Sequence, residues 1–403
     1  MRDRFLLFWC FGLGYFISNF LRAANAVIAP DLRADLGLSG ADLGVMTSLF
    51  YVGFAAVQLP LGGALDRYGT RTTMPLLMLF AAVGALIFAG AQDFAQAALG
   101  RTLIGIGMAG GLMGLLKAFG IWFGPQRYPI LSSVMVSLGA SGGLVAASPL
   151  AWANAQVGWR AVFVGCAVFV AVSAALIALL TRNAPAGATW QQPGTTRGGF
   201  GQIFRSAAFW RIGPMNFFLI GSLLALQTLW GAPFLIEVYG YSTAEAAAQL
   251  LLLSGGLALG YLASGPMATW RGNRGSFAVV APIFVGCLVL LGQPLVQWPP
   301  YIIGTLYAAL GFTGAFNLVL LTDIRQQFPQ HMSGRAATTV NMCGFGGAAL
   351  LQSLFGVVLS AAGRDATGNY LPAGYSVALL ALALGTGVAG WRYVRVPATI
   401  PDL

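Results

Sequence analysis

The chain has 403 residues, of which 58% are hydrophobic and only 8% charged, and its formal net charge is +10. A soluble domain carries about 25% charged residues, so this composition excludes a soluble protein and indicates an integral membrane protein. The positive charge then relates to membrane topology and not to nucleic-acid binding. Twenty of the 21 basic residues are arginine, and Lys117 is the only lysine.

Twelve apolar stretches are each close to the length of about 20 residues that a helix needs to cross a bilayer. In chain order they are 5–29, 42–62, 74–91, 96–123, 129–153, 161–181, 209–234, 244–267, 276–293, 301–322, 336–361 and 373–393. With a cytoplasmic N-terminus, 15 of the 21 basic residues fall on cytoplasmic segments. This positive-inside pattern predicts a multi-pass protein of the inner membrane with both termini in the cytoplasm. The first stretch lacks a small-residue cleavage site, so we interpret it as a span and not as a signal peptide.

A polar segment, 182–208, divides the spans into two groups of six. We interpret it as a cytoplasmic linker between an N-terminal bundle, 1–181, and a C-terminal bundle, 209–403. The two halves resemble each other, because SSVMV at 132–136 matches TTVNM at 338–342. Parallel repeats of six spans form a transporter architecture whose solute site lies near the midplane between the halves.

The loop after the second stretch reads GGALDRYGTR. It contains the pattern Gly-x-x-x-Asp-Arg-x-Gly-x-Arg, formed by Gly62, Asp66, Arg67, Gly69 and Arg71. This pattern resembles the signature loop of the major facilitator superfamily. The resemblance implies an all-α integral membrane protein with twelve transmembrane helices in two pseudo-symmetric six-helix bundles. It also implies a gating loop that latches the halves in the outward-facing state without touching the solute. The matching loop of the second half keeps Gly265 but has Thr269 in place of the acid, so we expect a one-sided latch.

Three basic residues lie inside the apolar stretches: Arg22, Arg101 and Lys117. A charge at membrane depth is costly unless it faces a cavity or a partner, so each is a functional candidate. Arg101 and Lys117 are about 24 Å apart along one helix. We therefore expect either Arg22 with Arg101, or Lys117 alone, to hold a solute. Two alternatives stay open: Arg101 can bond to backbone carbonyls, and Lys117 can extend to the headgroups.

The first stretch carries a polar face. Tyr15, Ser18, Arg22 and Asn25 follow the spacing of one helix face. In the superfamily that the chain resembles, the first and fourth spans of each half line the cavity. Further candidates for contact with a solute are the neutral polar and aromatic residues Tyr51, Gln58, Gln227, Trp230, Asn317 and Asn341. Amide side chains also join helices to one another, which is the structural alternative for these positions.

The charges inside the spans are expected to be positive only. No acidic residue falls at mid-membrane in this map, and the three embedded bases have no charged equivalents one repeat later. Cationic-drug antiporters and sugar:proton symporters usually need an embedded carboxylate. The sequence therefore predicts an anionic solute, which arginine or lysine can hold through a carboxylate or phosphate group.

The predicted function is secondary transport of a small organic anion, such as a mono- or dicarboxylate, by alternating access with proton symport or anion exchange. We expect a monomer in the lipid bilayer, with no cofactor, metal or nucleic acid, and the absence of a phosphate-binding loop argues against direct use of ATP. A proton-coupled drug or metabolite exporter is the alternative. The fifth stretch has Gly142, Gly143 and Pro149 but lacks the Gly-Pro pair of that branch. A membrane enzyme or sensor is disfavoured, because no catalytic cluster is apparent.

Overall fold

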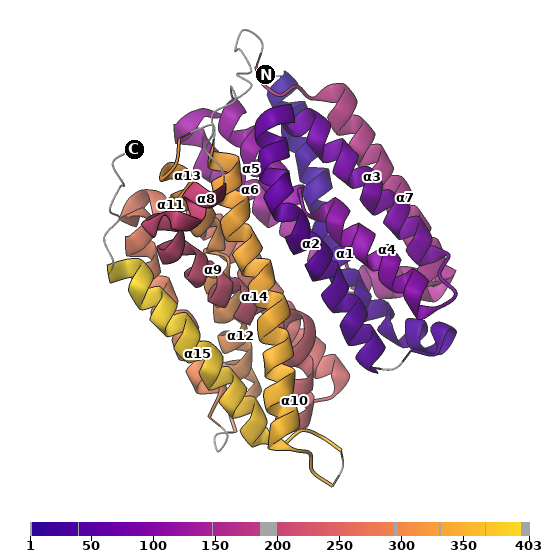
Figure 1. The fold of residues 1–403 in the computed structure, drawn as a ribbon. Helices are drawn as coiled ribbons and strands as arrows, with labels where there is room; N and C mark the ends of the chain where they lie inside the picture. The colour runs from indigo at the N-terminus through magenta and orange to yellow at the C-terminus, as the bar shows by residue number, and fades with distance from the viewer. Residues whose placement is uncertain are drawn as a thin grey trace. The chain divides into compact units, whose positions relative to one another are not determined.

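The computed structural model describes residues 2–38, 40–146, 148–185, 200–293, 297–329, 332–366 and 368–395. Apart from one isolated bridge between Arg364 and Tyr370, the regular structure in these ranges is helical. The helices, drawn in Figure 1, are α1 (Arg2–Leu36), α2 (Gly40–Tyr68), α3 (Thr70–Ala89), α4 (Phe94–Met108), α5 (Gly111–Trp122), α6 (Gly124–Val145), α7 (Ser148–Leu180), α8 (Phe200–Arg205), α9 (Ala207–Ala225), η1 (Leu226–Trp230), α10 (Gly231–Tyr239), α11 (Thr243–Leu291), α12 (Pro300–Gly314), α13 (Asn317–Gln326), α14 (Ser333–Ala362) and α15 (Pro372–Arg395).

Eleven helical runs of the described residues are long and apolar enough to cross a membrane. The longest, α11, contains Gly272 with a φ of 72°, so two helices meet there at a sharp turn. Division of α11 at this glycine separates the eighth and ninth predicted spans and gives twelve. The twelve-helix prediction is therefore confirmed. Of the predicted linker 182–208, residues 186–199 lie outside the described residues, and α8 forms within its last part.

The boundaries of the fifth and sixth spans differ in detail from the prediction. α6 ends at Val145, and the helical run of α7 begins at Ser148. Gly158, with a φ of 77°, then divides α7 by a sharp turn. The predicted fifth stretch, 129–153, is therefore interrupted after Val145. Pro149 stands just after this interruption, as expected of a residue that cannot continue a helix.

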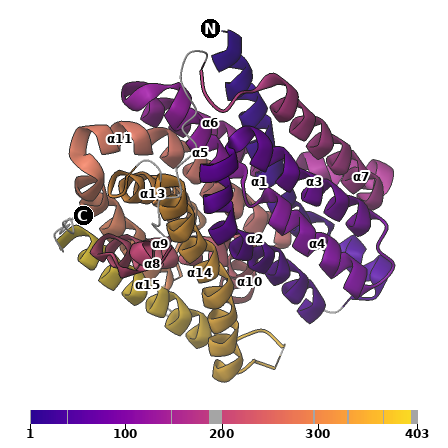
Figure 2. The same cartoon turned by 45° about the horizontal axis from the view of Figure 1, so that its top comes forward.

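The chain forms two compact units. The first comprises Met1–Phe200 with Phe328–Met342, and the second comprises Gly201–Gln327 with Cys343–Leu403. Helix α14 thus contributes its first residues to the first unit and the rest to the second. Figure 2 shows α1–α7 in indigo to magenta, α8–α10 in crimson to rose, and the later helices in orange to yellow.

The two units repeat each other in their helix breaks. Helices α4 and α12 are related by one constant shift in residue number. The shift from Phe94 to Pro300, where the helices begin, equals the shift from Met108 to Gly314, where they end. In both cases the helix resumes after a short break, as α5 and α13, and these starts are related by the same offset. We call this spacing the repeat offset. Glycines with positive φ recur at nearly the same spacing, since Gly69 and Gly272 have φ values of 76° and 72°. The internal similarity predicted from the sequence is therefore visible in the backbone.

Close helix contacts repeat at equivalent glycines. A Cβ at Gly105 would collide with the backbone oxygen of Phe50. Gly311 is related to Gly105 by the repeat offset, and a Cβ there would collide with the backbone oxygen of Leu253. Small residues at such points let the backbones of membrane helices approach closely. Each unit therefore uses the same kind of packing between its second and fourth spans.

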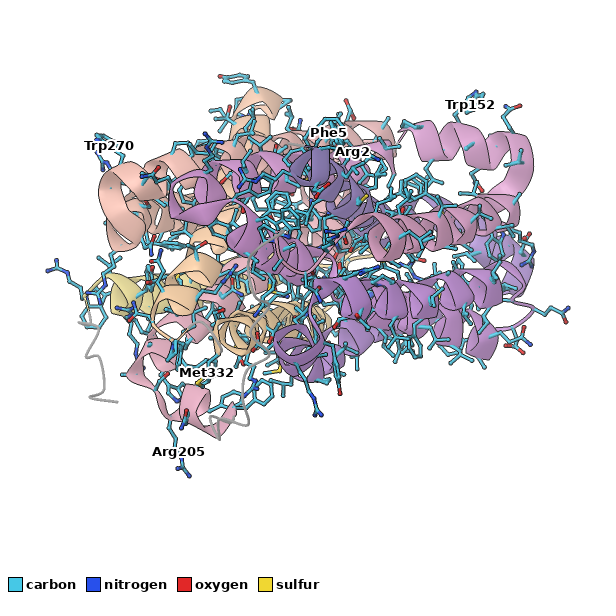
Figure 3. The ribbon with its side chains drawn as sticks, turned by 90° about the horizontal axis from the view of Figure 1, so that it is seen from above. Arg2, Phe5, Trp152, Arg205, Trp270 and Met332 are labelled. Carbon is cyan, nitrogen blue, oxygen red and sulfur yellow. The ribbon has the colours of Figure 1, made fainter. Side chains whose placement is uncertain are left out.

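Large apolar side chains lie on the outside of the helices. Trp152 and Trp270 are 70% and 77% exposed, and both project away from the ribbon in Figure 3. Exposed aromatic residues of this kind suit the interface between lipid and water. The surface thus agrees with the membrane protein that the composition indicates.

Candidate functional site

The signature loop contains a buried ion pair. Asp66 lies in the last turn of α2, and its side chain is fully buried. Its Oδ1 lies 2.5 Å from Nζ of Lys117, and its Oδ2 lies 3.6 Å from Nε of Arg335. The expectation that Lys117 has no acidic partner is therefore wrong. An ammonium at membrane depth is costly without a cavity or a partner, and this partner was not predicted because the two residues lie on different helices, 51 positions apart in the chain.

The second unit holds a buried ion pair at the repeat-equivalent position. The repeat offset relates Lys117 to Asp323, so the expectation that Lys117 has no charged equivalent is also wrong. Asp323 Oδ2 lies 3.4 Å from Nη2 of Arg211 and accepts a hydrogen bond of 2.8 Å from the hydroxyl of Tyr393. Its Oδ1 accepts a bond of 3.2 Å from Gln327. The charges inside the helices are therefore not all positive.

Glycines bring the start of α14 against the end of α2 within the first unit. A Cβ at Gly62 would collide with the Thr338 hydroxyl and lie 2.8 Å from Cα of Arg335. A Cβ at Gly334 would collide with the carboxylate of Asp66. The two glycines therefore permit the approach that lets Arg335 reach Asp66.

Arg101 is fully buried between the first, second and third helices. Its Nη1 donates a hydrogen bond of 3.0 Å to the backbone oxygen of Leu21. The guanidinium carbon lies 5.3 Å from the ring centre of Phe50 and 5.7 Å from that of Phe88. This is the backbone contact that the structural alternative describes. It brings Arg101 to α1 one residue before Arg22.

The polar face of α1 is present, and it includes a residue that the sequence analysis missed. Half-buried Arg22 donates through Nη2 to Oδ1 of Asn19. The Nδ2 of Asn19 donates to the backbone oxygen of Tyr15 at 2.9 Å. Asn25 donates to the Thr47 hydroxyl at 2.8 Å. The position of Asn19, one helical turn before Arg22, was the available signal for its contact with that side chain.

Two of the predicted polar residues hold the break in the fourth span. Ser18 donates to the backbone oxygen of Met108 at 3.4 Å, and Gln58 donates to that of Ala109 at 3.1 Å. Gln58 is fully buried. Tyr51 is also buried and packs edge-on against Phe50, with ring centres 5.4 Å apart. The contact of Gln58 joins α2 to the fourth span, whereas the contact of Tyr51 is with its neighbour on α2.

Gln227 and Trp230 lie in a π-helical turn, η1, of the second unit. Trp230 donates to the backbone oxygen of Gln352 at 3.0 Å and stacks on Phe355 with ring centres 5.5 Å apart. Gln352 in turn donates to the backbone oxygen of Leu224 at 3.1 Å. Gln227 donates to the Ser254 hydroxyl at 3.3 Å. A π-helical turn is rare and is often found at functional sites.

Asn317 and Asn341 are both buried, at 5% and 2% exposure. Oδ1 of Asn317 and Nδ2 of Asn341 have no hydrogen-bond partner among the described residues. Such groups cost free energy unless something bonds them, so both positions stay candidates for contact with a solute. In the same described ranges, no group of three His, Cys, Asp or Glu side chains could hold a metal ion.

Two related helical units and many membrane spans are the architecture of a membrane transporter. A family model described as Major Facilitator Superfamily matches residues 11–352. The chain therefore belongs to the major facilitator superfamily.

The fold also resembles that of a solved transporter. A bacterial homolog of the human lysosomal transporter Spinster, in an inward-facing and unoccupied conformation, superposes with a TM-score of 0.62. The superposition covers 97% of this chain and 96% of that one, at 18% sequence identity. At this identity the likeness concerns the fold alone.

Several relatives bear the names of anion transporters. A probable sulfoacetate transporter of Cupriavidus necator is 25% identical over 431 residues, which cover all of this chain and 96% of the relative. A nitrate/nitrite transporter of Picosynechococcus sp. is 27% identical over 226 residues, and a probable L-galactonate transporter of Escherichia coli is 30% identical over 159. These two matches span only 42% and 34% of the relatives' own lengths.

Proposed function

We propose that the protein is a secondary transporter of small organic anions of the carboxylate or sulfonate type. It moves them across the inner membrane by alternating access, driven by proton symport or anion exchange. The observation that carries this proposal is the half-buried guanidinium of Arg22 on the polar face of α1. The names of the relatives, which include transporters of sulfoacetate and galactonate, support the same class of solute.

Comparison of the three predicted bases favours Arg22 as the anion-binding residue. Lys117 is engaged by Asp66, and Arg101 is fully buried against the backbone of α1. Arg22 is more accessible than either, and Asn19 holds it at a fixed place on its helix. A planar guanidinium with several donors matches the two oxygens of a carboxylate, or two of a sulfonate. Because Asp66 and Asp323 balance buried bases, an excess of positive charge no longer supports an anionic solute, and Arg22 is the residue that does.

Uptake into proteoliposomes tests the proposal. The purified full-length protein is reconstituted, and entry of labelled sulfoacetate, tartrate and nitrate is measured with and without an inward proton gradient or an internal anion. We expect saturable uptake of at least one organic anion that depends on one of these two driving forces. Proton-driven movement of a cationic dye, with no competition by any anion, would instead establish the exporter alternative.

Arg22→Gln is the decisive variant. Loss of a charged hydrogen-bond partner to a buried anion costs about 3 kcal/mol, so we expect uptake to fall roughly 100-fold. Arg22→Lys should keep part of the activity, because it keeps the charge but not the planar fork. Arg4→Gln, on the exposed first turn of the same helix, is the matched control and should transport normally. Normal uptake by Arg22→Gln would remove Arg22 from the site.

A further inference from the structure

Helix α3 begins at the signature loop without a cap of its own. Its N-cap residue, Gly69, has a φ of 76° and no side chain that could accept a hydrogen bond. The first turn of a helix presents backbone N–H groups that need acceptors from outside the helix. Serine, threonine, aspartate or asparagine usually provides one at the N-cap position. In this loop the acceptor must come from elsewhere in the chain.

Asn183, which follows the end of α7, provides it. Its Oδ1 accepts a hydrogen bond of 2.9 Å from the backbone N–H of Arg71, the second residue of α3. Its Nδ2 donates a bond of 3.3 Å to the backbone oxygen of Tyr68, the last residue of α2. One amide group therefore holds the chain on both sides of Gly69. A Cβ at Gly69 would collide with this amide, so the glycine is needed for the contact as well as for its φ.

The segment around Asn183 is fastened to the first unit at further points. The backbone oxygen of Arg182 accepts a bond of 3.1 Å from the indole of Trp122, at the end of α5. The side chain of Arg71 donates a bond of 2.9 Å to the backbone oxygen of Ala178 in α7. The chain that leaves α7 toward the second unit is thus tied to α3, to α5 and to the signature loop. Helices α5 and α2 also carry the two members of the buried ion pair, Lys117 and Asp66.

The equivalent turn of the second half is built differently. Gly272 has nearly the same φ, 72°, but a Cβ there would meet no atom within 4 Å. The next residue, Asn273, donates instead to Oε1 of Gln326 at 3.3 Å. The left-handed turn therefore does not itself require a distant amide. The Asn183 contact is an addition to the first-half loop.

We infer that Asn183 is a positioning residue of the gate: it caps α3 from outside and couples the start of the segment between the bundles to the signature loop. This inference rests on the proposed alternating-access function. By fixing Tyr68 and Arg71, Asn183 fixes the last turn of α2 and so directs Asp66 toward Lys117 and Arg335. A displacement of residues 182–183 would then reach the ion pair through Asn183 on the α2 side and through the contact of Arg182 with Trp122 on the α5 side.

Hydrogen exchange tests the contact without reference to any solute. The full-length protein in lipid nanodiscs is labelled, and exchange is followed in peptides that cover residues 68–74. In Asn183→Ala we expect roughly tenfold faster exchange at the Arg71 amide. Asn183→Asp should keep this amide protected, because a carboxylate oxygen accepts the same bond. Asn154→Ala, which removes a different side-chain contact to Asp31 in the same unit, should leave the peptide unchanged.

Transport kinetics test the role in gating. With labelled sulfoacetate as the probe, Asn183→Ala should lower the maximal uptake rate several-fold and leave the half-saturation concentration unchanged, while the thermal unfolding midpoint stays close to that of the parent protein. Equal exchange in Asn183→Ala and the parent would overturn the cap. Faster local exchange with unchanged uptake would overturn the gating role. Failure of the parent protein to move any anion would contradict the proposed function and leave the exchange result as it stands.

Discussion

The two equivalent loops, 62–71 and 265–274, share a backbone but not a chemistry. Each has a glycine in the left-handed region, with φ values of 76° at Gly69 and 72° at Gly272. In the first loop the carboxylate of Asp66 contacts two bases. In the second, the hydroxyl of Thr269 only donates to the backbone oxygen of Gly265 at 3.0 Å. The comparison teaches that glycine determines the turn, whereas the side chains around it determine whether the turn can act as a gate.

The buried ion pairs of the two units also combine an equivalent position with different side chains. Lys117 and Asp323 occupy equivalent positions with opposite charges. The first unit places its acid on α2 and its base on α5, and the second places its base on α9 and its acid on α13. Each unit neutralises the charge at this position, but by a different helix pair. In both units the charged residue at this position has an oppositely charged partner, but the residues and the partner helix differ.

The largest expected effect comes from breaking the pair of the second unit. Arg211→Met removes the base that contacts Asp323 and leaves a buried carboxylate bonded to the neutral groups of Tyr393 and Gln327. Removal of one partner of a buried pair costs about 3 kcal/mol or more. Lys117→Met should cost about half as much, because Arg335 stays close to Asp66. Thermal unfolding of both variants in the same detergent measures the difference.

A double variant separates charge from packing in this prediction. Arg211→Met combined with Asp323→Leu removes both charges and should recover much of the lost stability, as apolar replacements of buried pairs often do. An equal loss in Lys117→Met and Arg211→Met would show that the two pairs do not differ in the way that the contacts indicate.

The next effect should be the same in both units. Gly105→Ala and Gly311→Ala each place a Cβ against a backbone oxygen of the neighbouring helix. Forcing an extra carbon into such a contact costs about 2 kcal/mol. We expect the two midpoints of thermal unfolding to fall by similar amounts. A large difference between them would mean that the packing of the two units has diverged as far as their loops have.

The smallest effect distinguishes the two turns directly. Gly69→Ala and Gly272→Ala both put an L-residue at a positive φ with an extended ψ, a conformation that costs about 2 kcal/mol. Gly69→Ala should cost about 1 kcal/mol more, because the new Cβ displaces Asn183 and α3 loses its cap. The difference between the two unfolding midpoints is the quantity to measure. In an Asn183→Ala background this difference should disappear.

The spans and the repeat could be predicted from the sequence because they depend on long apolar runs and on glycine. The breaks at 109–110 and 315–316 could not, because they fall inside long apolar runs that also fit an unbroken helix, and the nearby Gly110 and Asn317 do not by themselves indicate a break. The helix-joining role of Gln58 was one of the two alternatives that the sequence left open, but the break that it bonds was not predicted.

The ion pairs were missed for a different reason. Asp66 was placed in a loop, but α2 continues to Tyr68 and carries this carboxylate inward. Asp323 was placed near the inner side and was not matched to Lys117, because the two equivalent residues carry opposite charges. Pairing between helices far apart in sequence is a tertiary property, and residue type at one position does not reveal it. The contact of Asn183 was missed because its partners lie far away along the chain, whereas the contact of Asn19 could have been found from its helical spacing to Arg22.

The break in the fourth span has a consequence for the synthesis of the protein and its insertion into the membrane. A broken helix exposes backbone oxygens that lipid cannot satisfy. Here Ser18 on α1 and Gln58 on α2 bond these oxygens, and both helices are synthesised before the fourth span. A ribosome that delivers the chain from its N-terminus therefore supplies the partners before the exposed oxygens that need them. The order of the helices along the chain therefore lets α1 and α2 enter the membrane before the broken fourth span that they stabilise.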